Sequence, residues 1–147
     1  MRVSIWLFVG FGVAAAASTQ AASPERLEAV PVAKVVIDDA FWAPKLKVWR
    51  EVTIPDCLAK FEKDGAIVNF ENVRDGKGAG THAGPPWYDG LIYEMIRGCA
   101  DFLAVRRDPA LEARLDAYIE KIAAAQAKDP TGYLETWTML KEPDHRF

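Results

Sequence analysis

Apolar residues recur with helical spacing along most of the second half of the chain. The widest apolar stripe begins near Pro86 and repeats at steps of one, three and four residues. A stripe of this width predicts an amphipathic helix that buries one face against the rest of the protein. Its members are Leu91, Ile92, Met95, Ile96, Cys99, Phe102 and Leu103.

A second helix is predicted directly after the first. Asp108 and Pro109 supply an N-cap and a first-turn proline, and the run ends near residues 128–130 at a proline that cannot continue a helix. Two such helices form an αα-hairpin, and because each has a wide apolar face, the hairpin needs further partners. We therefore expect an array or toroid of hairpins. No repeat of fixed period is visible, which disfavours a solenoid with a strict motif. The apolar face of the second helix contains Leu111, Leu115, Tyr118, Ile119 and Ile122.

The first part of the chain predicts one strand and one interrupted helix. Residues 28–39 (EAVPVAKVVIDD) are rich in β-branched side chains, which favours a short β-strand. Helical spacing then extends over residues 45–63, where Pro55 predicts a break and a new helix with this proline in its first turn. Asp64 and Gly65 are expected to end that helix.

Two further segments are predicted to be non-helical. Residues 73–86 are rich in glycine, hold two prolines and have no periodic apolar positions. The phosphate-binding pattern GxxxxGK[ST] is absent from this loop, and His82 within it is interpreted as a solvated loop histidine. Residues 131–138 (TGYLETWT) either line a pocket or cover the hairpin as an apolar lid, and the sequence leaves both interpretations open.

Composition places the chain among ordinary globular domains. Of its 147 residues, 50% are hydrophobic and 27% are charged, and the formal net charge is −3. These values exclude a disordered chain, a collagen-like repeat and a disulfide-dense small protein, and no basic patch favours nucleic acid as a partner. Cys57 and Cys99 lie on apolar sides of helical patterns and outside any CxxC motif, so we expect two buried thiols rather than a disulfide or a zinc site.

The N-terminal residues have the pattern of a secretory signal peptide. Met1 and Arg2 precede an apolar run over residues 3–17, and small residues lead to a predicted cleavage site after Ala21. A run of about fifteen residues is shorter than the roughly 20 that a spanning helix needs, which disfavours a stable membrane anchor. We therefore expect residues 1–21 to be removed and the mature protein to be exported to the periplasm or secreted.

Candidate chemistry within the chain is sparse. No pair of carboxylates with the spacing of a general acid and base is evident, and the motifs GxSxG and HExxH are absent. The segment Trp87-Tyr88-Asp89 places aromatic rings beside a carboxylate at the start of the first predicted helix, a combination suited to stacking on a sugar ring and binding its hydroxyls. The alternative interpretation is a helix start, in which Asp89 favours the helix dipole and Trp87 packs against the preceding loop.

Three segments in sequence order resemble the β-L-arabinofuranosidase family, glycoside hydrolase family 127. Residues 35–42 (VVIDDAFW) are similar to the family's opening strand, Asp and Phe-Trp. Residues 119–138 are similar to its I-x-x-AQ-x-x-DGYL-x-T segment, and Glu142-Pro143 with Arg146-Phe147 resembles the P-x-x-R-W piece that follows. The resemblance covers about residues 32–147, nearly all of the expected mature chain.

The sequence also departs from the family pattern. Asp89 is the only position kept from a DSD-V type segment, because Gly90, Leu91 and Ile92 follow it. Thr131 replaces the Asp of DGYL, and Glu135 stands where Asn is common. These departures concern the sugar and linkage that the protein accepts and leave the resemblance in fold intact.

The resemblance implies an (α/α)6 toroid catalytic domain followed by β-rich domains, in a protein several times longer than this chain. It implies cleavage of terminal β-L-arabinofuranosides with retention, by a cysteine nucleophile that also binds zinc and has glutamates nearby. In the family pattern those residues lie downstream of this chain, so they are not assigned to Cys57 or Cys99. We therefore expect no catalytic residue and no metal ligand in this chain, with zinc a cofactor of the full-length protein.

Together these observations predict an all-α fold, part of an (α/α)6 toroid with a short N-terminal β-strand. Residues 22–147 are expected to form the N-terminal part of a secreted glycoside hydrolase domain, truncated at its C-terminus and inactive alone. Its expected partner is an oligo- or polysaccharide with terminal β-L-arabinofuranosides, or a related plant or bacterial glycan. The alternative is a small exported, non-catalytic helical protein that binds a glycan or another protein. The residues expected to line the sugar-binding cleft are Trp87, Tyr88, Asp89, Tyr133, Thr136 and Trp137.

Overall fold

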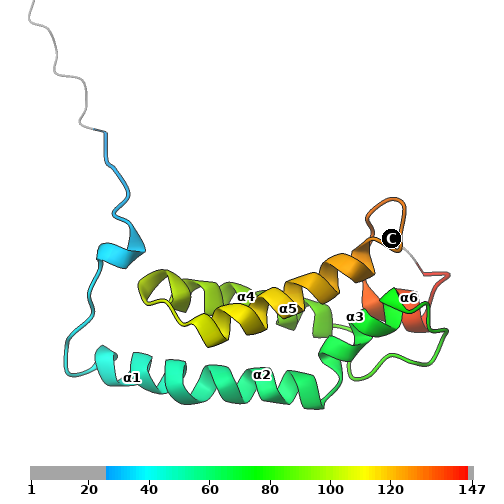
Figure 1. Ribbon diagram of the computed structural model, residues 1–147, viewed down its shortest axis with the longest axis horizontal. Coiled ribbons are helices and arrows are strands. Elements are labelled where there is room, and N and C mark those ends of the chain that lie inside the picture. Colours follow the sequence, from blue (N-terminus) through cyan, green and yellow to red (C-terminus); the bar gives the residue numbers. More distant parts are fainter. Residues whose placement is uncertain (1–25, 146–147) are drawn as a thin grey trace, which may run out of the picture.

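The computed structural model describes residues 26–145, which are helical and contain no strand (Figure 1). The predicted signal peptide (residues 1–21), Arg146 and Phe147 lie outside the described residues. Two long helices lie alongside a helical rod, and two short helices pack at one end of them (Figure 1). The rod consists of α1 (Trp42–Val48), the π-helical turn η2 (Trp49–Thr53) and α2 (Ile54–Lys63), and the remaining helices are α3 (Ala66–Arg74), α4 (Tyr88–Val105), α5 (Pro109–Gln126) and α6 (Thr136–Lys141).

The predicted hairpin is confirmed, since α4 and α5 cover the two segments that have apolar stripes. Asp108 is the N-cap of α5, and its Oδ1 accepts hydrogen bonds from the backbone N–H groups of Ala110 and Leu111, each at 3.1 Å. Pro109 occupies the first turn, as predicted. An all-helical architecture with this hairpin is consistent with the predicted fragment of an (α/α)6 toroid.

The predicted N-terminal β-strand is wrong. The segment holds only a short 3-10 helix, η1 (Val32–Lys34), followed by extended backbone at Val35. A strand needs a partner for its N–H and C=O groups, and the described part of the chain offers none. The β-branched side chains therefore remain on the surface, with Val36 79% exposed. Strand propensity predicted an extended conformation here but could not supply the pairing.

Pro55 disturbs the first helix less than predicted. It lies in the first turn of α2, as expected, but the chain does not break before it. Instead the backbone widens into the π-helical turn η2, which includes Glu51, the residue whose carbonyl the proline ring would meet in a regular helix. The π turn thus lets one continuous rod accommodate a proline. The rod ends at Asp64 and Gly65, with Gly65 at φ 84°.

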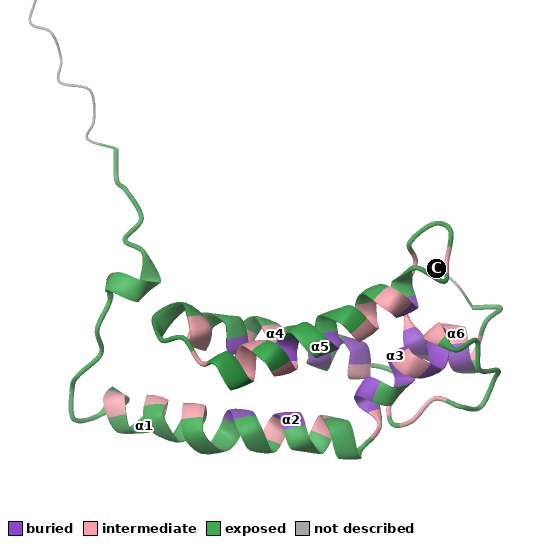
Figure 2. Cartoon of the chain, viewed as in Figure 1, coloured by how far each residue is buried: buried purple, intermediate pink, exposed green. Residues whose placement is uncertain are grey.

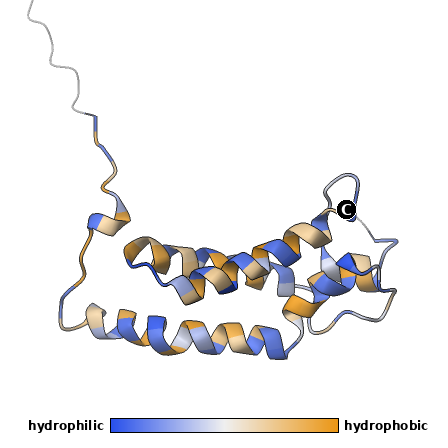
Figure 3. Ribbon diagram, viewed as in Figure 1, coloured by the Kyte–Doolittle hydropathy of each residue, from blue (hydrophilic) through white to orange (hydrophobic). Residues whose placement is uncertain are grey.

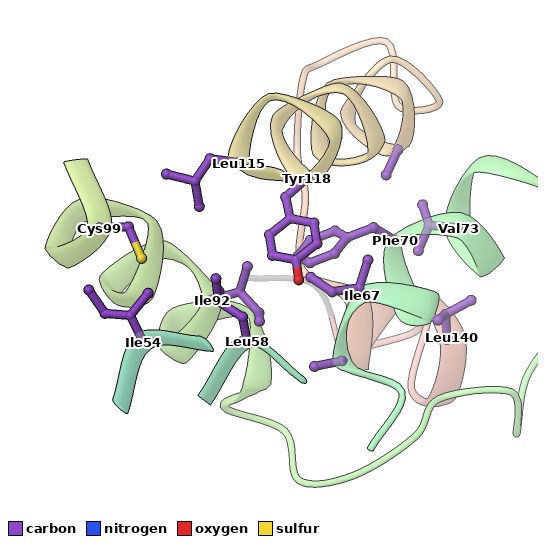
Figure 4. Close-up of a cluster of buried hydrophobic side chains, with 12 residues drawn as sticks. Ile54, Leu58, Ile67, Phe70, Val73, Ile92, Cys99, Leu115, Tyr118 and Leu140 are labelled. Carbon is purple, nitrogen blue, oxygen red and sulfur yellow. The ribbon is translucent and has the colours of Figure 1, made fainter. Parts of the chain in front are cut away.

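Helix α3 is not among the predicted elements, although it lies at the centre of the core. Its residues Ile67, Phe70 and Val73 are buried, and Figure 4 shows the Tyr118 ring pointing from α5 toward Ile67 and Phe70. Buried positions gather around α3 and α6, whereas α1 is largely exposed (Figure 2). Hydrophobic residues accordingly remain at the surface of α1 and of the segment before it (Figure 3).

Both cysteines are free thiols. Cys99 is buried on α4, as predicted, and burial raises the pKa of its thiol. Cys57 is only half-buried on α2. Among residues 26–145, no helix combines the length and the apolar character that crossing a membrane would require.

Candidate functional site

Two of the predicted site residues, Asp89 and Thr136, bind each other across 47 positions of sequence. The Asp89 Oδ2 atom accepts the backbone N–H of Thr136 at 2.7 Å, and its Oδ1 atom accepts the Thr136 hydroxyl at 2.7 Å. Asp89 lies in the first turn of α4, and Thr136 is the first residue of α6. Both residues are buried, so the carboxylate joins the starts of the two helices.

The surroundings of Asp89 act on its charge in opposite directions. Burial raises the pKa of its carboxyl group, and the nearby Glu135 carboxylate adds to that increase. The two hydrogen bonds from Thr136 oppose it, because they stabilise the ionised form. The pKa remains above that of an exposed aspartate. Asp89 is therefore a buried acid whose ionised form depends on Thr136.

A second carboxylate, that of Glu135, lies beside this contact. It is the N-cap of α6, where its side chain accepts the backbone N–H of Thr138 at 2.5 Å. Burial raises the pKa of Tyr93 to about 12, and the charges of Asp89 and Glu135 add to that increase. The structure thus brings together two carboxylates and a phenol that sequence spacing did not relate, because the acids are far apart in the chain.

His82 is not the solvated loop residue that the sequence predicted. It is half-buried, and its ring meets the Trp137 ring edge-on, with centroids 5.2 Å apart and an interplanar angle of 77°. Its Nε2 atom lies 3.1 Å from the Asn69 side-chain nitrogen Nδ2. Burial is the main cause that lowers the pKa of the imidazole. The predicted loop therefore carries this histidine against side chains of α3 and α6 instead of into solvent.

Two buried asparagines of α3 hold this loop. Asn69 accepts the Ala83 N–H through Oδ1 at 2.8 Å and donates to the Ala83 carbonyl through Nδ2 at 2.9 Å. Asn72 donates to the Thr81 carbonyl at 2.9 Å. Polar residues at otherwise apolar helix positions are the sequence signal that could have identified both contacts.

The predicted aromatic residues differ in how far their rings are exposed to solvent. Trp87, just before α4, is 64% exposed, so its ring is open to solvent. Tyr88 is half-buried and meets the Phe61 ring edge-on at 6.3 Å. Trp137 is half-buried, and the ammonium group of Lys141, which is also on α6, lies 4.1 Å from the centroid of its ring. Tyr133 is half-buried in the turn before α6.

No group of three or more His, Cys, Asp or Glu side chains among residues 26–145 is arranged to hold a metal ion. The donor set that zinc prefers, three or four thiolates, imidazoles or carboxylates on one centre, therefore does not fit the described residues. What these residues offer instead is aromatic surface beside the buried Asp89 and the half-buried Glu135, at the end of the molecule where α3, α4 and α6 meet.

Comparison with known proteins identifies relatives of the chain. Residues 34–147 match a family model described as "Beta-L-arabinofuranosidase, GH127 catalytic domain". A solved structure described as "The GH127, Beta-arabinofuranosidase, BT3674" is similar, with a TM-score of 0.67 and 32% sequence identity over 80% of this chain. The chain spans 18% of the length of that structure. No curated protein was found to match the chain.

Proposed function

The chain belongs to the β-L-arabinofuranosidase family GH127, and we propose that the protein it forms part of is a glycoside hydrolase. In this proposal residues 22–147 make the first part of an (α/α)6 toroid catalytic domain. The observation that carries it is the family match over residues 34–147, together with the likeness in structure to a GH127 β-arabinofuranosidase.

The proposed substrates are oligo- or polysaccharides that end in β-L-arabinofuranosides, or related plant or bacterial glycans, and the proposed mechanism retains the anomeric configuration. In the family pattern the catalytic cysteine and glutamates lie downstream of this chain, so the proposal places them outside it. The ligands of a zinc ion would also come from outside, since the described residues hold no group of three or more possible metal ligands. The signal-peptide pattern of residues 1–21 supports export to the periplasm or secretion.

Within this chain, the proposed contribution to substrate binding is one wall of the sugar-binding cleft, at the starts of α4 and α6. The exposed Trp87 ring supplies a flat face for the C–H side of a sugar. Asp89 and Thr136 fix the start of α6 against the start of α4. They thereby hold Trp137, and Tyr133 in the preceding turn, in position. Tyr88 supports the wall from inside through its contact with Phe61.

The experiment is a kinetic comparison of Trp87→Ala with the wild type in the full-length protein, using a chromogenic β-L-arabinofuranoside. Losing one stacked ring removes about 1.5 kcal/mol of binding, so we expect KM to rise roughly tenfold. Trp49→Ala is the matched control, because Trp49 is also exposed but lies on the rod at η2. Unchanged kinetics of Trp87→Ala on every substrate would remove Trp87 from the wall. If the wild type releases no L-arabinose from any such glycoside, the proposed substrate is wrong.

A further inference from the structure

The side chain of Asn69 has only one possible orientation. Its Oδ1 atom must face the Ala83 N–H, and its Nδ2 atom must face the Ala83 carbonyl, at 2.8 and 2.9 Å. Turning the amide over would set donor against donor and acceptor against acceptor. Asn69 is completely buried on α3, so water cannot take over either contact. The second N–H of Nδ2 is therefore held toward His82.

This orientation of Asn69 determines which ring nitrogen of neutral His82 carries the proton. Because an N–H of Asn69 faces Nε2 at 3.1 Å, Nε2 must accept, and the neutral ring carries its proton on Nδ1. The Nδ1 atom is buried and has no hydrogen-bond partner within the described residues. A second proton on Nε2 would set two N–H groups against each other at this contact. Asn69 cannot turn to relieve the conflict, so the imidazole ring would have to move.

The charged groups around His82 come from two elements. Asp89 on α4, Glu135 at the N-cap of α6 and the Gly84 backbone in the loop favour the charged imidazole, whereas Lys141 on α6 opposes it. Burial outweighs the favourable groups, so the pKa of His82 is lower than that of a free histidine. The neutral form is thus the one that the surrounding structure selects at neutral pH.

A movement of the His82 ring would displace the ring of Trp137, which it contacts. The two rings meet edge-on at 5.2 Å, and Trp137 lies in the first turn of α6, next to the Thr136 that binds Asp89. We propose that neutral His82, held by Asn69, positions the Trp137 ring of the sugar-binding wall, and that protonation of His82 breaks the Asn69 contact and releases that ring. The inference rests on the proposed function, in which Trp137 contributes to the wall.

The test follows the Trp137 ring as the pH is lowered. The full-length protein is labelled with 5-fluorotryptophan, and the 19F resonance that Trp137→Phe lacks is that of Trp137. We expect this resonance to move between pH 7.5 and 5 with a single midpoint below 6.5, the ordinary histidine value. A resonance that does not titrate, or titrates at 6.5 or above, would overturn the proposal.

Substitutions of the two histidines identify the group responsible. His82→Gln places a non-titrating acceptor near the position of Nε2, so the Trp137 resonance should stay at its pH 7.5 position throughout. His82→Asn is too short to reach Asn69 and should show the low-pH position at every pH. His145→Gln is the matched control, since His145 is the other histidine of the chain and is exposed beside Glu142. A pH-dependent shift that survives in His82→Gln contradicts the proposal. If the His82 variants do not fold, the wild-type titration decides it, because a Trp137 resonance with no midpoint below 6.5 overturns the proposal without any variant.

The pH dependence of sugar affinity distinguishes a failure of this proposal from a failure of the proposed function. If only neutral His82 gives a competent wall, the Kd for methyl β-L-arabinofuranoside should rise about tenfold for each pH unit below the midpoint. In His82→Gln the Kd should be constant over the same range. A Trp137 resonance that titrates with His82 in a protein that binds no arabinofuranoside would uphold the positioning and refute the proposed function. Binding whose Kd is independent of pH, with a titrating ring, would refute the role of His82 in the wall.

Discussion

The contact between Thr136 and Asp89 provides a sharp test of how the end of the molecule near α6 is held together. Thr136→Val keeps the shape of the side chain and removes the hydroxyl that donates to Asp89 Oδ1 at 2.7 Å. The backbone N–H of residue 136 remains available to Oδ2. The substitution therefore deletes one of two hydrogen bonds to a buried carboxylate and nothing else of comparable size.

The expected magnitude follows from the charge and burial of the acceptor. A hydrogen bond to a charged group contributes about 1.5 to 3 kcal/mol, and water cannot replace the lost donor because Asp89 is only 6% exposed. Since about 1.4 kcal/mol corresponds to a factor of ten, the opening equilibrium of the Asp89–Thr136 contact should become roughly tenfold to a hundredfold more favourable. The amides at the start of α6 should lose protection by that factor.

The pH dependence has a defined sign. The pKa of Asp89 is raised by burial, so the folded protein takes up a proton at higher pH than the unfolded chain does. Stability linked to this group therefore rises as the pH falls through the folded-state pKa. Removing the Thr136 hydroxyl raises that pKa further, so the variant gains more from protonation than the wild type. The difference between them should shrink at low pH.

The assay is native-state hydrogen exchange by mass spectrometry, read on peptides that cover residues 133–142 and corrected for intrinsic exchange rates. Thr138→Val is the matched control, because Thr138 is buried on the same helix and its hydroxyl does not bond to Asp89. Equal protection of Thr136→Val and wild type at pH 7 would refute the reasoning. A difference that grows as the pH is lowered would refute the assigned charge of Asp89.

Two further predictions concern the loop and the rod, both measured as urea unfolding midpoints by tryptophan fluorescence. Gly84→Ala should lower the free energy of unfolding by about 2 to 4 kcal/mol, because φ is +77° and the added Cβ would overlap the Tyr88 ring. Gly76→Ala is the control and should lower it by only about 1 kcal/mol, because φ is +66° there but the space around the residue is open. Equal losses would contradict the overlap. Tyr118→Phe should lose about 1 kcal/mol at pH 7, because the Tyr118 hydroxyl donates to Glu62 between α5 and α2. Hydrogen bonds from Arg114 and, to a smaller extent, from Tyr118 hold the pKa of Glu62 below its usual value. The loss of stability in Tyr118→Phe should therefore disappear as the pH falls through the folded-state pKa of Glu62. A loss that persists in acid would point to packing instead.

Sequence patterns predicted the helices that carry their own boundary signals. For α4 and α5, a wide apolar stripe, the Asp108 cap and the proline at position 109 all agree, and the structure confirms them. Helix α3 has no such agreement, because Asn69 and Asn72 interrupt its apolar face and no cap precedes it. Its position is determined by what the asparagines bind in the loop. Such tertiary contacts cannot be derived from helical periodicity.

The candidate site was likewise predicted only in part by the sequence. Residue types selected Asp89 at a predicted helix start and Thr136 in a segment predicted to be non-helical, although the structure begins α6 at Thr136. They did not show that the two candidate residues bind each other. Glu135 and Tyr93 escaped selection because their relation to Asp89 exists only after α6 packs against α4. His82 was misinterpreted because a glycine-rich loop usually faces solvent, whereas two buried side chains hold this one against α3.

The distribution of buried polar groups favours the end of the molecule near α6 as the functional end. The buried polar side chains of the described residues all lie on α3, α4 or α6, and they are Asn69, Asn72, Asp89, Thr136 and Thr138. Burying such groups is unfavourable unless each is hydrogen-bonded, and apolar side chains of similar size would stabilise helix packing at least as well. Stability alone therefore does not explain why they gather here. What they do accomplish is to fix the loop before α4 and the start of α6, the two segments that present Trp87 and Trp137. The opposite end, at α1, has exposed apolar side chains and none of the buried polar side chains found among the described residues, so a positioned set of binding groups is to be sought at the starts of α4 and α6.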